Sequence, residues 1–402
     1  MRTHPPPTVS FGGQQKPPGS ALQTWFPRSV KDFIVSMNRK VMIAAVAALS
    51  SLALAACGSE GPSSSATGNG GSATSAPAQL SGTLAGSGAT SQAAAQTAWI
   101  AKYATIQPNV KVSYGGGGSG QGQSDFKSGA VSFAGSDAVL TDADMKAGNF
   151  GQCTSSSNAL NLPVYISPIA IVFHLDGVTD LNLDAPTTAK IFSGKITTWN
   201  DPAIKALNPS ANLPSSPISV VHRADKSGTT ENFTDTLHVT APDIWTEAGS
   251  QTWPTAFAGE SANGTSGVVT AVKNGAGTIG YADESQAKDL SIAKFGTSGN
   301  FVGPTAEAAA QVVEASPQMP NRPAKDVSLQ LDRKASGYPF VLVSYLLACE
   351  EYKDSNTAAL VKSYLGYVSS SEGQQVAQQN AGSAPLPSAL ATKVKDAIDS
   401  IK

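Results

Sequence analysis

Hydrophobic and polar positions alternate in short stretches near the start of the folded sequence. Residues 84–90 predict a strand that ends in a glycine turn, and residues 110–114 and 131–133 show the period of two that is typical of strands. Helices are predicted over residues 91–103 and in a short segment that ends at Gly129. Strand, glycine loop and helix therefore alternate, which predicts an α/β sheet whose loops meet at one edge.

Longer apolar stretches follow. Residues 162–173 are apolar with a proline near the middle, which suits a segment that crosses between two lobes. Residues 338–347 predict either a buried strand or the start of a helix. Further elements are helices at 187–192 and 358–368, a strand at 218–221, and a turn with a short strand at 277–281.

The N-terminal region has the pattern of a targeting segment. A basic start at residues 37–40 precedes an apolar stretch at 41–54, which is short for a membrane span. Leu54-Ala55-Ala56-Cys57 then resembles the bacterial lipoprotein cleavage box, in which the cysteine is lipidated and becomes the first mature residue. A plain secretion signal or a short buried helix is the alternative.

We therefore expect three N-terminal zones. Residues 1–36 are a disordered extension or lie upstream of the true start at Met37, residues 37–56 are the signal peptide, and residues 57–79 are a Gly/Ser/Ala-rich flexible tether. Folded sequence begins near Leu80.

Composition narrows the class of protein. The chain has 402 residues, 41% hydrophobic and 14% charged, with a net charge of −2. That is enough for two lobes and gives no electrostatic case for nucleic acid as a partner. Once Cys57 is assigned to lipid, Cys153 and Cys349 remain as a pair in an exported protein, so we predict a disulfide between them. Two separate buried thiols are the alternative.

Residues 223–230 carry the clearest chemistry. Arg223 offers a planar fork to two anion oxygens, and Ser227 is a predicted cap of the helix that follows. A helix start has N–H groups without partners and attracts phosphate-like anions. The alternative is a capped helix beside a surface arginine. Thr90, Ser119, Ser227 and Thr229 give three loops the same character of small residues and hydroxyl donors.

Asp137 distinguishes between anions. A carboxylate repels a bound anion unless that anion has a proton to donate, which hydrogen phosphate has and sulfate lacks. Asp137 is therefore expected to accept a ligand proton. Asp225 could serve likewise, but we expect it to orient Arg223 through an ion pair.

Six segments, in order, make the chain resemble the phosphate-binding proteins of bacterial ABC-type phosphate importers. They are Gly86-Ser87-Gly88-Ala89-Thr90, Gly118-Ser119-Gly120, Phe133-Ala134-Gly135-Ser136-Asp137, residues 191–202, residues 223–230 and Gly277-Thr278-Ile279-Gly280-Tyr281. The resemblance spans residues 80–290, with a weaker match towards the C-terminus. Two departures are Ser91, where the family often has an aromatic residue, and Lys226, where glycine is common.

The resemblance implies a ligand set for inorganic phosphate. Its members are Thr90, Ser91 through its backbone N–H, Ser119, Asp137, Arg223, Asp225 beside the arginine, Ser227, Gly228 and Thr229. No cofactor and no metal are expected, since the sequence has no His/Cys/Asp cluster with metal spacing.

The resemblance also implies the architecture and the partners. The fold would be α/β, a two-lobed periplasmic-binding-protein-like (type II) fold with the ligand cleft between the lobes. Residues 80–164 with 292–402 would form lobe 1 and residues 165–291 lobe 2, with crossovers near Pro163 and Ala293. The protein would be a monomer, held to the outer face of the cell membrane by its lipid, and would deliver phosphate to ABC permease subunits.

Three other functions remain open. The same fold could bind sulfate, molybdate, phosphonate or another oxyanion, or could serve as an adhesin or signalling protein. A hydrolase or phosphatase is the third, but Ser119 lacks the G-x-S-x-G pattern because Gln121 replaces its last glycine.

Overall fold

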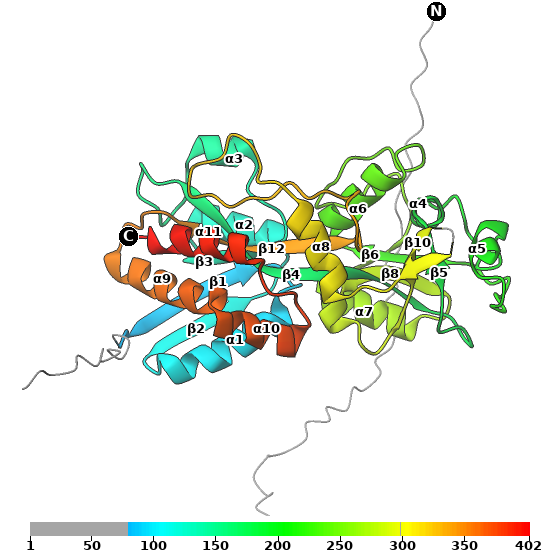
Figure 1. Cartoon of the computed structure of the whole chain (residues 1–402), viewed down its shortest axis with the longest axis horizontal. Coiled ribbons are helices and arrows are strands. Elements are labelled where there is room, and N and C mark those ends of the chain that lie inside the picture. Colours follow the sequence, from blue (N-terminus) through cyan, green and yellow to red (C-terminus); the bar gives the residue numbers. More distant parts are fainter. Residues whose placement is uncertain (1–78, 298) are drawn as a thin grey trace, which may run out of the picture. The chain divides into compact units, whose positions relative to one another are not determined.

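The computed structural model describes residues 79–297 and 299–402, and three parallel strands open its sheet (Figure 1). Strand β1 (Gly82–Gly88) pairs in parallel with β2 (Val110–Gly115) and β3 (Phe133–Ser136). Helices α1 (Ala93–Ile106) and α2 (Ser119–Ser128) connect them. Parallel pairing brings the carboxyl ends of the strands to one edge, so the predicted alternation and gathering of loops are confirmed.

Two long buried strands link the two halves of the sheet. Strand β4 (Ala159–His174) pairs antiparallel with β12 (Val341–Cys349) over its first part and with β8 (Thr278–Asp283) over its last part. Almost every residue of β4 is buried, which explains its continuous apolar sequence. The predicted crossing segment is therefore β4, and the segment left open between strand and helix is strand β12.

The second half repeats the α/β pattern. Strand β6 (Ser219–Arg223) lies between β8 and β7 (Glu260–Ala262), parallel to both. Its helices are α4 (Ala185–Phe192), α5 (Pro202–Leu207), α6 (Gly228–Thr240) and α7 (Gly264–Asn274). Smaller elements are β5 (Asn182–Leu183), the 3-10 turn η1 (Glu284–Gln286), β9 (Ser291–Ile292), β10 (Lys294–Thr297) and β11 (Asn300–Val302).

The remaining helices pack mainly around the first half. They are α3 (Asp142–Ala147), α8 (Ala306–Ala315), α9 (Ser355–Ser369), α10 (Ser371–Ala381) and α11 (Ser388–Asp399). In Figure 1, α9, α10 and α11 lie with α1 at one end of β12, whereas α8 lies along β4. Among the described residues, the main sheet has the order β2-β1-β3-β12-β4-β8-β6-β7, with β9 added to β4.

The predicted return between lobes is less simple than the sequence indicates. The resemblance implies a return near Ala293, yet β10 directly after that residue pairs with β5, at Lys294↔Asn182. Strands β10 and β11 therefore still lie with the second half, and the pairing favours a later return through β12. The exact lobe boundaries remain a prediction.

Several N-terminal predictions lie outside the described residues. These are the extension 1–36, the signal peptide 37–56, the lipidated Cys57 and nearly all of the tether. Across the described ranges, the structure holds no helix with the length and apolar character needed to cross a membrane.

Cys153 and Cys349 are joined in a disulfide between the loop before β4 and the end of β12. The two cysteines are 196 residues apart, so the bond closes a loop that contains most of the folded sequence. A long closed loop restricts the unfolded chain strongly.

Replacing both cysteines with serine is expected to lower the free energy of unfolding by about 2–5 kcal/mol. Urea denaturation of the variant and of the unchanged protein, each with and without reductant, measures the difference. Reductant should destabilise only the unchanged protein. Equal midpoints for both proteins without reductant would contradict the bond.

Candidate anion-binding site

The start of α6 is fixed to the end of β6 by a small hydrogen-bond set. Ser227 is the N-cap, and its Oγ accepts from the backbone N–H of Thr230 at 3.2 Å. The Tyr281 hydroxyl accepts from the backbone N–H of Arg223 at 3.2 Å and bonds the Thr230 hydroxyl at 2.7 Å. The arginine and the helix N-terminus, with its partial positive charge, are therefore held next to each other.

Arg223 forms a two-point ion pair with Asp225. Its Nε lies 2.8 Å from Oδ1 and its Nη2 lies 2.5 Å from Oδ2, while the backbone N–H of Gly264 donates to Oδ1 at 3.0 Å. Burial opposes the charge on Asp225, but the hydrogen bonds and charge of Arg223 lower the pKa of that carboxyl below its usual value. Asp225 thus occupies the Nε–Nη2 edge of the guanidinium, and Nη1 does not contact it.

Asp137 is buried and surrounded by hydroxyl donors. Ser91 and Ser344 donate to Oδ1 at 2.6 and 2.5 Å, and Thr229 donates to Oδ2 at 3.0 Å. Burial raises the pKa of Asp137 above its ordinary value, while the three hydroxyls and the charge of Arg223 work against that rise. The donors thereby offset much of the cost of a buried carboxylate.

The other predicted residues lie around this pair. The Ser119 Oγ accepts from the backbone N–H of Asp137 at 3.0 Å, so its own proton remains available to donate. Gly228 packs so closely that a Cβ there would lie 2.6 Å from the Asp137 Cβ and 2.7 Å from the Ser119 Oγ. Thr90 reaches across to Thr265, whose hydroxyl lies 3.0 Å from the Thr90 Oγ1.

The structure thus brings together the predicted set: Thr90, Ser91, Ser119, Asp137, Arg223, Asp225, Ser227, Gly228 and Thr229. Besides the backbone N–H that the resemblance assigns to the ligand, Ser91 has a hydroxyl that donates to Asp137. Their roles as ligands of an anion remain predictions.

Three further residues of this site are not apparent from the sequence. Thr265, in the first turn of α7, lies between Thr90 and Arg223, whose Nη1 donates to its Oγ1 at 3.5 Å. Asn232 donates from Nδ2 to the Asp137 carbonyl at 2.8 Å. Ser344 donates to the Asp137 carboxylate. A hydroxyl inside the apolar run of β12 was the available signal for Ser344, because buried polar groups need partners.

Arg333 supports this arrangement from behind. Its Nη2 donates to the Asn232 Oδ1 at 2.5 Å and its Nε pairs with Asp235 at 3.0 Å. Asn232 is therefore fixed on one side while its amide nitrogen holds both the Asp137 and the Gly228 carbonyls. A cavity of about 480 Å³ lies beside Asp137 at this point.

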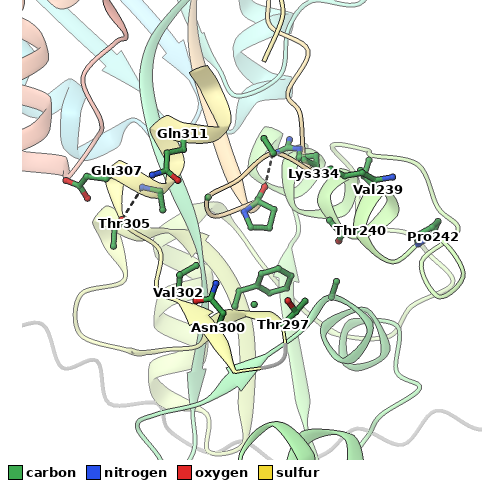
Figure 2. Close-up of a pocket in the computed structure, with 18 residues that line it drawn as sticks. Val239, Thr240, Pro242, Thr297, Asn300, Val302, Thr305, Glu307, Gln311 and Lys334 are labelled. Atoms are coloured by element: carbon green, nitrogen blue, oxygen red, sulfur yellow. Dashed lines mark hydrogen bonds between the residues drawn. The ribbon is translucent and has the colours of Figure 1, made fainter. Parts of the chain in front are cut away.

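A larger cavity, of about 900 Å³, lies elsewhere in the second half (Figure 2). Figure 2 shows it between α8, the β10–β11 hairpin and the end of α6, with Gln311, Asn300 and Thr240 around it. None of the predicted ligand residues lines it. Size alone is therefore a poor guide to the site, whereas the convergence of hydroxyl donors on Asp137, beside the Arg223 guanidinium, is specific.

The chain matches one protein superfamily and, within it, one family. Residues 73–372 match the PBP superfamily domain. The chain is 36% identical over 330 residues to phosphate-binding protein PstS 3 of Mycobacterium leprae, a match that covers 79% of this chain and 87% of that protein. It is 34% identical over 327 residues to phosphate-binding protein PstS of Methanocaldococcus jannaschii, covering 76% and 82%. The chain therefore belongs to the PstS family of phosphate-binding proteins, within the PBP superfamily.

Solved structures confirm the predicted fold. The high-affinity periplasmic phosphate-binding protein PfluDING, solved with bound phosphate, is similar with a TM-score of 0.63 at 24% identity, over 79% of this chain and 93% of that one. A putative phosphate ABC transporter substrate-binding protein from Clostridium perfringens gives 0.53 at 21% identity, over 75% and 98%. The fold is thus α/β and periplasmic-binding-protein-like, of type II. In the part of the chain that the structure describes, no three His, Cys, Asp or Glu side chains could share a metal ion.

Proposed function

We propose that this protein binds inorganic phosphate outside the cytoplasm and delivers it to an ABC-type phosphate import permease. The observation that carries the proposal is a buried carboxylate, Asp137, placed among hydroxyl donors, a guanidinium and a helix N-terminus. Relatives that carry the name phosphate-binding protein PstS support the same ligand.

The chemistry favours a protonated oxyanion. Arg223 Nη1, the hydroxyls of Ser119 and Thr90, and the N–H groups that begin α6 supply donors, each able to contribute about 1.5–3 kcal/mol when the acceptor is charged. Asp137 can only accept while it is ionised. Hydrogen phosphate satisfies both sets, whereas sulfate leaves Asp137 facing a like charge.

Binding, not catalysis, is the activity we propose, since the family is one of substrate-binding proteins. Closure of two lobes on the ligand would exclude water, and opening would release phosphate to the permease. Lipidation of Cys57, attachment to the outer face of the membrane and a monomeric state belong to the same proposal.

Calorimetric titration of the purified protein, freed of bound phosphate, tests the function. Phosphate is expected to bind at micromolar concentration or lower, which corresponds to about −8 kcal/mol, and sulfate, molybdate and a phosphonate are expected to bind far more weakly. Equal affinities for phosphate and sulfate would favour the general oxyanion binder. Turnover of p-nitrophenyl phosphate that Ser119→Ala abolishes would instead favour the phosphatase.

Gly228→Ala is expected to weaken phosphate binding at least tenfold while changing the unfolding temperature little. The added Cβ would clash with Asp137 and Ser119 across the cleft, yet alanine is at least as favourable as glycine in the first turn of a helix. Titration and thermal unfolding measure the two effects. Gly194→Ala, at a position with nothing within 4 Å but a φ of 72°, is the control and should cost stability alone. Unchanged affinity in Gly228→Ala would contradict closure at this contact.

A further inference from the structure

A line of buried side chains ends on the Asp137 carboxylate. The Tyr364 hydroxyl on α9 donates to the Gln96 Oε1 at 2.8 Å, and Gln96 Nε2 donates to the Gln92 Oε1 at 2.8 Å. Gln92 Nε2 then donates to the Ser344 Oγ at 2.6 Å, and Ser344 donates to the Asp137 Oδ1 at 2.5 Å. The four donors are at most 1% exposed. We call Tyr364, Gln96, Gln92 and Ser344 the donor chain.

The direction of the donor chain is fixed at one point. Gln92 Nε2 also donates to the Tyr345 carbonyl at 3.1 Å. If the Gln92 amide were reversed, its oxygen would face that carbonyl, so the nitrogen must lie there. Gln92 Oε1 consequently needs a donor, which is Gln96 Nε2, and Gln96 Oε1 needs the Tyr364 hydroxyl. Burial raises the pKa of Tyr364 well above its ordinary value, so this hydroxyl keeps its proton.

The donor chain makes the two carboxylate oxygens of Asp137 unequal. Among the described residues, Oδ1 accepts from two hydroxyls, Ser344 and Ser91, whereas Oδ2 accepts from Thr229 alone, at 3.0 Å. A carboxylate oxygen has about two acceptor directions. Oδ1 is therefore saturated, and Oδ2 has one direction left.

We propose that the donor chain positions Asp137 and holds it as an acceptor, so that the proton of a bound oxyanion is received at Oδ2. The inference rests on the proposed phosphate function and adds a specificity-determining role for Ser344 and the residues behind it. Ser344 acts through Asp137 and is a positioning residue.

The readout is the pH dependence of sulfate binding. Sulfate has no proton to give, so it pairs with Asp137 only when Asp137 is itself protonated, and its binding should rise as the pH falls. The charged and titratable groups that interact with Asp137 are Arg223 on β6, Tyr114 on β2, Glu231 on α6 and Asp283 on β8. Ser344→Ala leaves all four in place.

Ser344→Ala is expected to move the onset of sulfate binding up by about one pH unit and to lower the phosphate-to-sulfate affinity ratio at neutral pH about tenfold. General damage to the site would weaken the binding of both anions and would not raise the affinity for sulfate. Ser344→Thr retains the hydroxyl and should show the same pH dependence of sulfate binding as the unchanged protein. Titrations use the full chain with inorganic phosphate and with sulfate between pH 5 and 8.

Two tyrosines provide a matched pair for the far end of the donor chain. Tyr364 and Tyr103 are both buried between α1 and α9, with ring centroids 5.1 Å apart, but the Tyr103 hydroxyl donates to Ser363 instead. Tyr364→Phe should shift the sulfate profile in the same direction by roughly twofold in affinity ratio, and Tyr103→Phe should not. This pair carries the test if Ser344→Ala fails to fold.

A Ser344→Ala profile that coincides with the unchanged protein overturns the proposal, and so does a Tyr364→Phe profile equal to that of Tyr103→Phe. In both cases normal phosphate binding by the unchanged protein leaves the proposed function standing. Failure of the unchanged protein to bind phosphate overturns the function and this inference together.

Discussion

Replacing Arg223 with alanine is expected to lower phosphate affinity by roughly a thousandfold, about 4 kcal/mol. Two effects add. The substitution removes the guanidinium that would face the ligand, and it leaves the Asp225 carboxylate, now without its partner at 2.5 Å, next to an anion. Calorimetry with phosphate measures the loss.

Lys226→Ala is the matched control for Arg223→Ala. It removes a positive charge three residues along the same loop, but Lys226 is exposed. Exposed charges contribute little, so its affinity should stay within about threefold of the unchanged protein. If both variants lose affinity equally, general positive potential would be responsible, and the specific role of Arg223 would be refuted.

Local patterns made much of the site predictable. The sequence predicts the start of helix α6 from the cap at Ser227, and in the structure this cap accepts from the Thr230 N–H, while Phe233 and Leu237 on the helix are buried. The strand that delivers Arg223 is likewise predicted from a few neighbouring residues, at 218–221, and the structure has it as β6. Such features are set by neighbours in sequence, which is why they can be read without knowing the fold.

Distant contacts explain what the sequence did not reveal. Ser344 lies 207 residues from Asp137, and Thr265 lies 175 residues from Thr90. The pairing of β10 with β5, which keeps residues after Ala293 in the second half, is likewise invisible in a local pattern. Only the order of strands in the sheet brings these residues together, and periodicity does not specify that order.

Asp137→Asn is expected to lower the phosphate-to-sulfate affinity ratio by about a hundredfold, chiefly by improving sulfate binding. The two hydroxyls of Ser91 and Ser344 donate to one carboxylate oxygen, so the amide oxygen of asparagine should take that position. The amide nitrogen then replaces Oδ2 and donates to the anion. Sulfate, which has no proton to donate and is repelled by the Asp137 carboxylate, can then accept a hydrogen bond from the asparagine amide.

The pH dependence of sulfate binding should change with the same substitution. Burial raises the pKa of Asp137, so in the unchanged protein sulfate binding should increase as the pH falls through that pKa and a donor proton appears. Asparagine does not titrate, and its sulfate binding should stay flat. Competition titrations of phosphate with sulfate across the pH range measure both effects.

Asp225→Asn separates proton acceptance from simple charge removal. It adds the same unit of net charge near the same guanidinium, but its side chain orients Arg223 instead of lying among the hydroxyls. We expect Asp225→Asn to weaken phosphate binding and sulfate binding about equally and to leave the ratio of the two affinities unchanged. A ratio that shifts as much in Asp225→Asn as in Asp137→Asn would show that net charge alone selects the anion, because the two variants differ only in where the acceptor was lost.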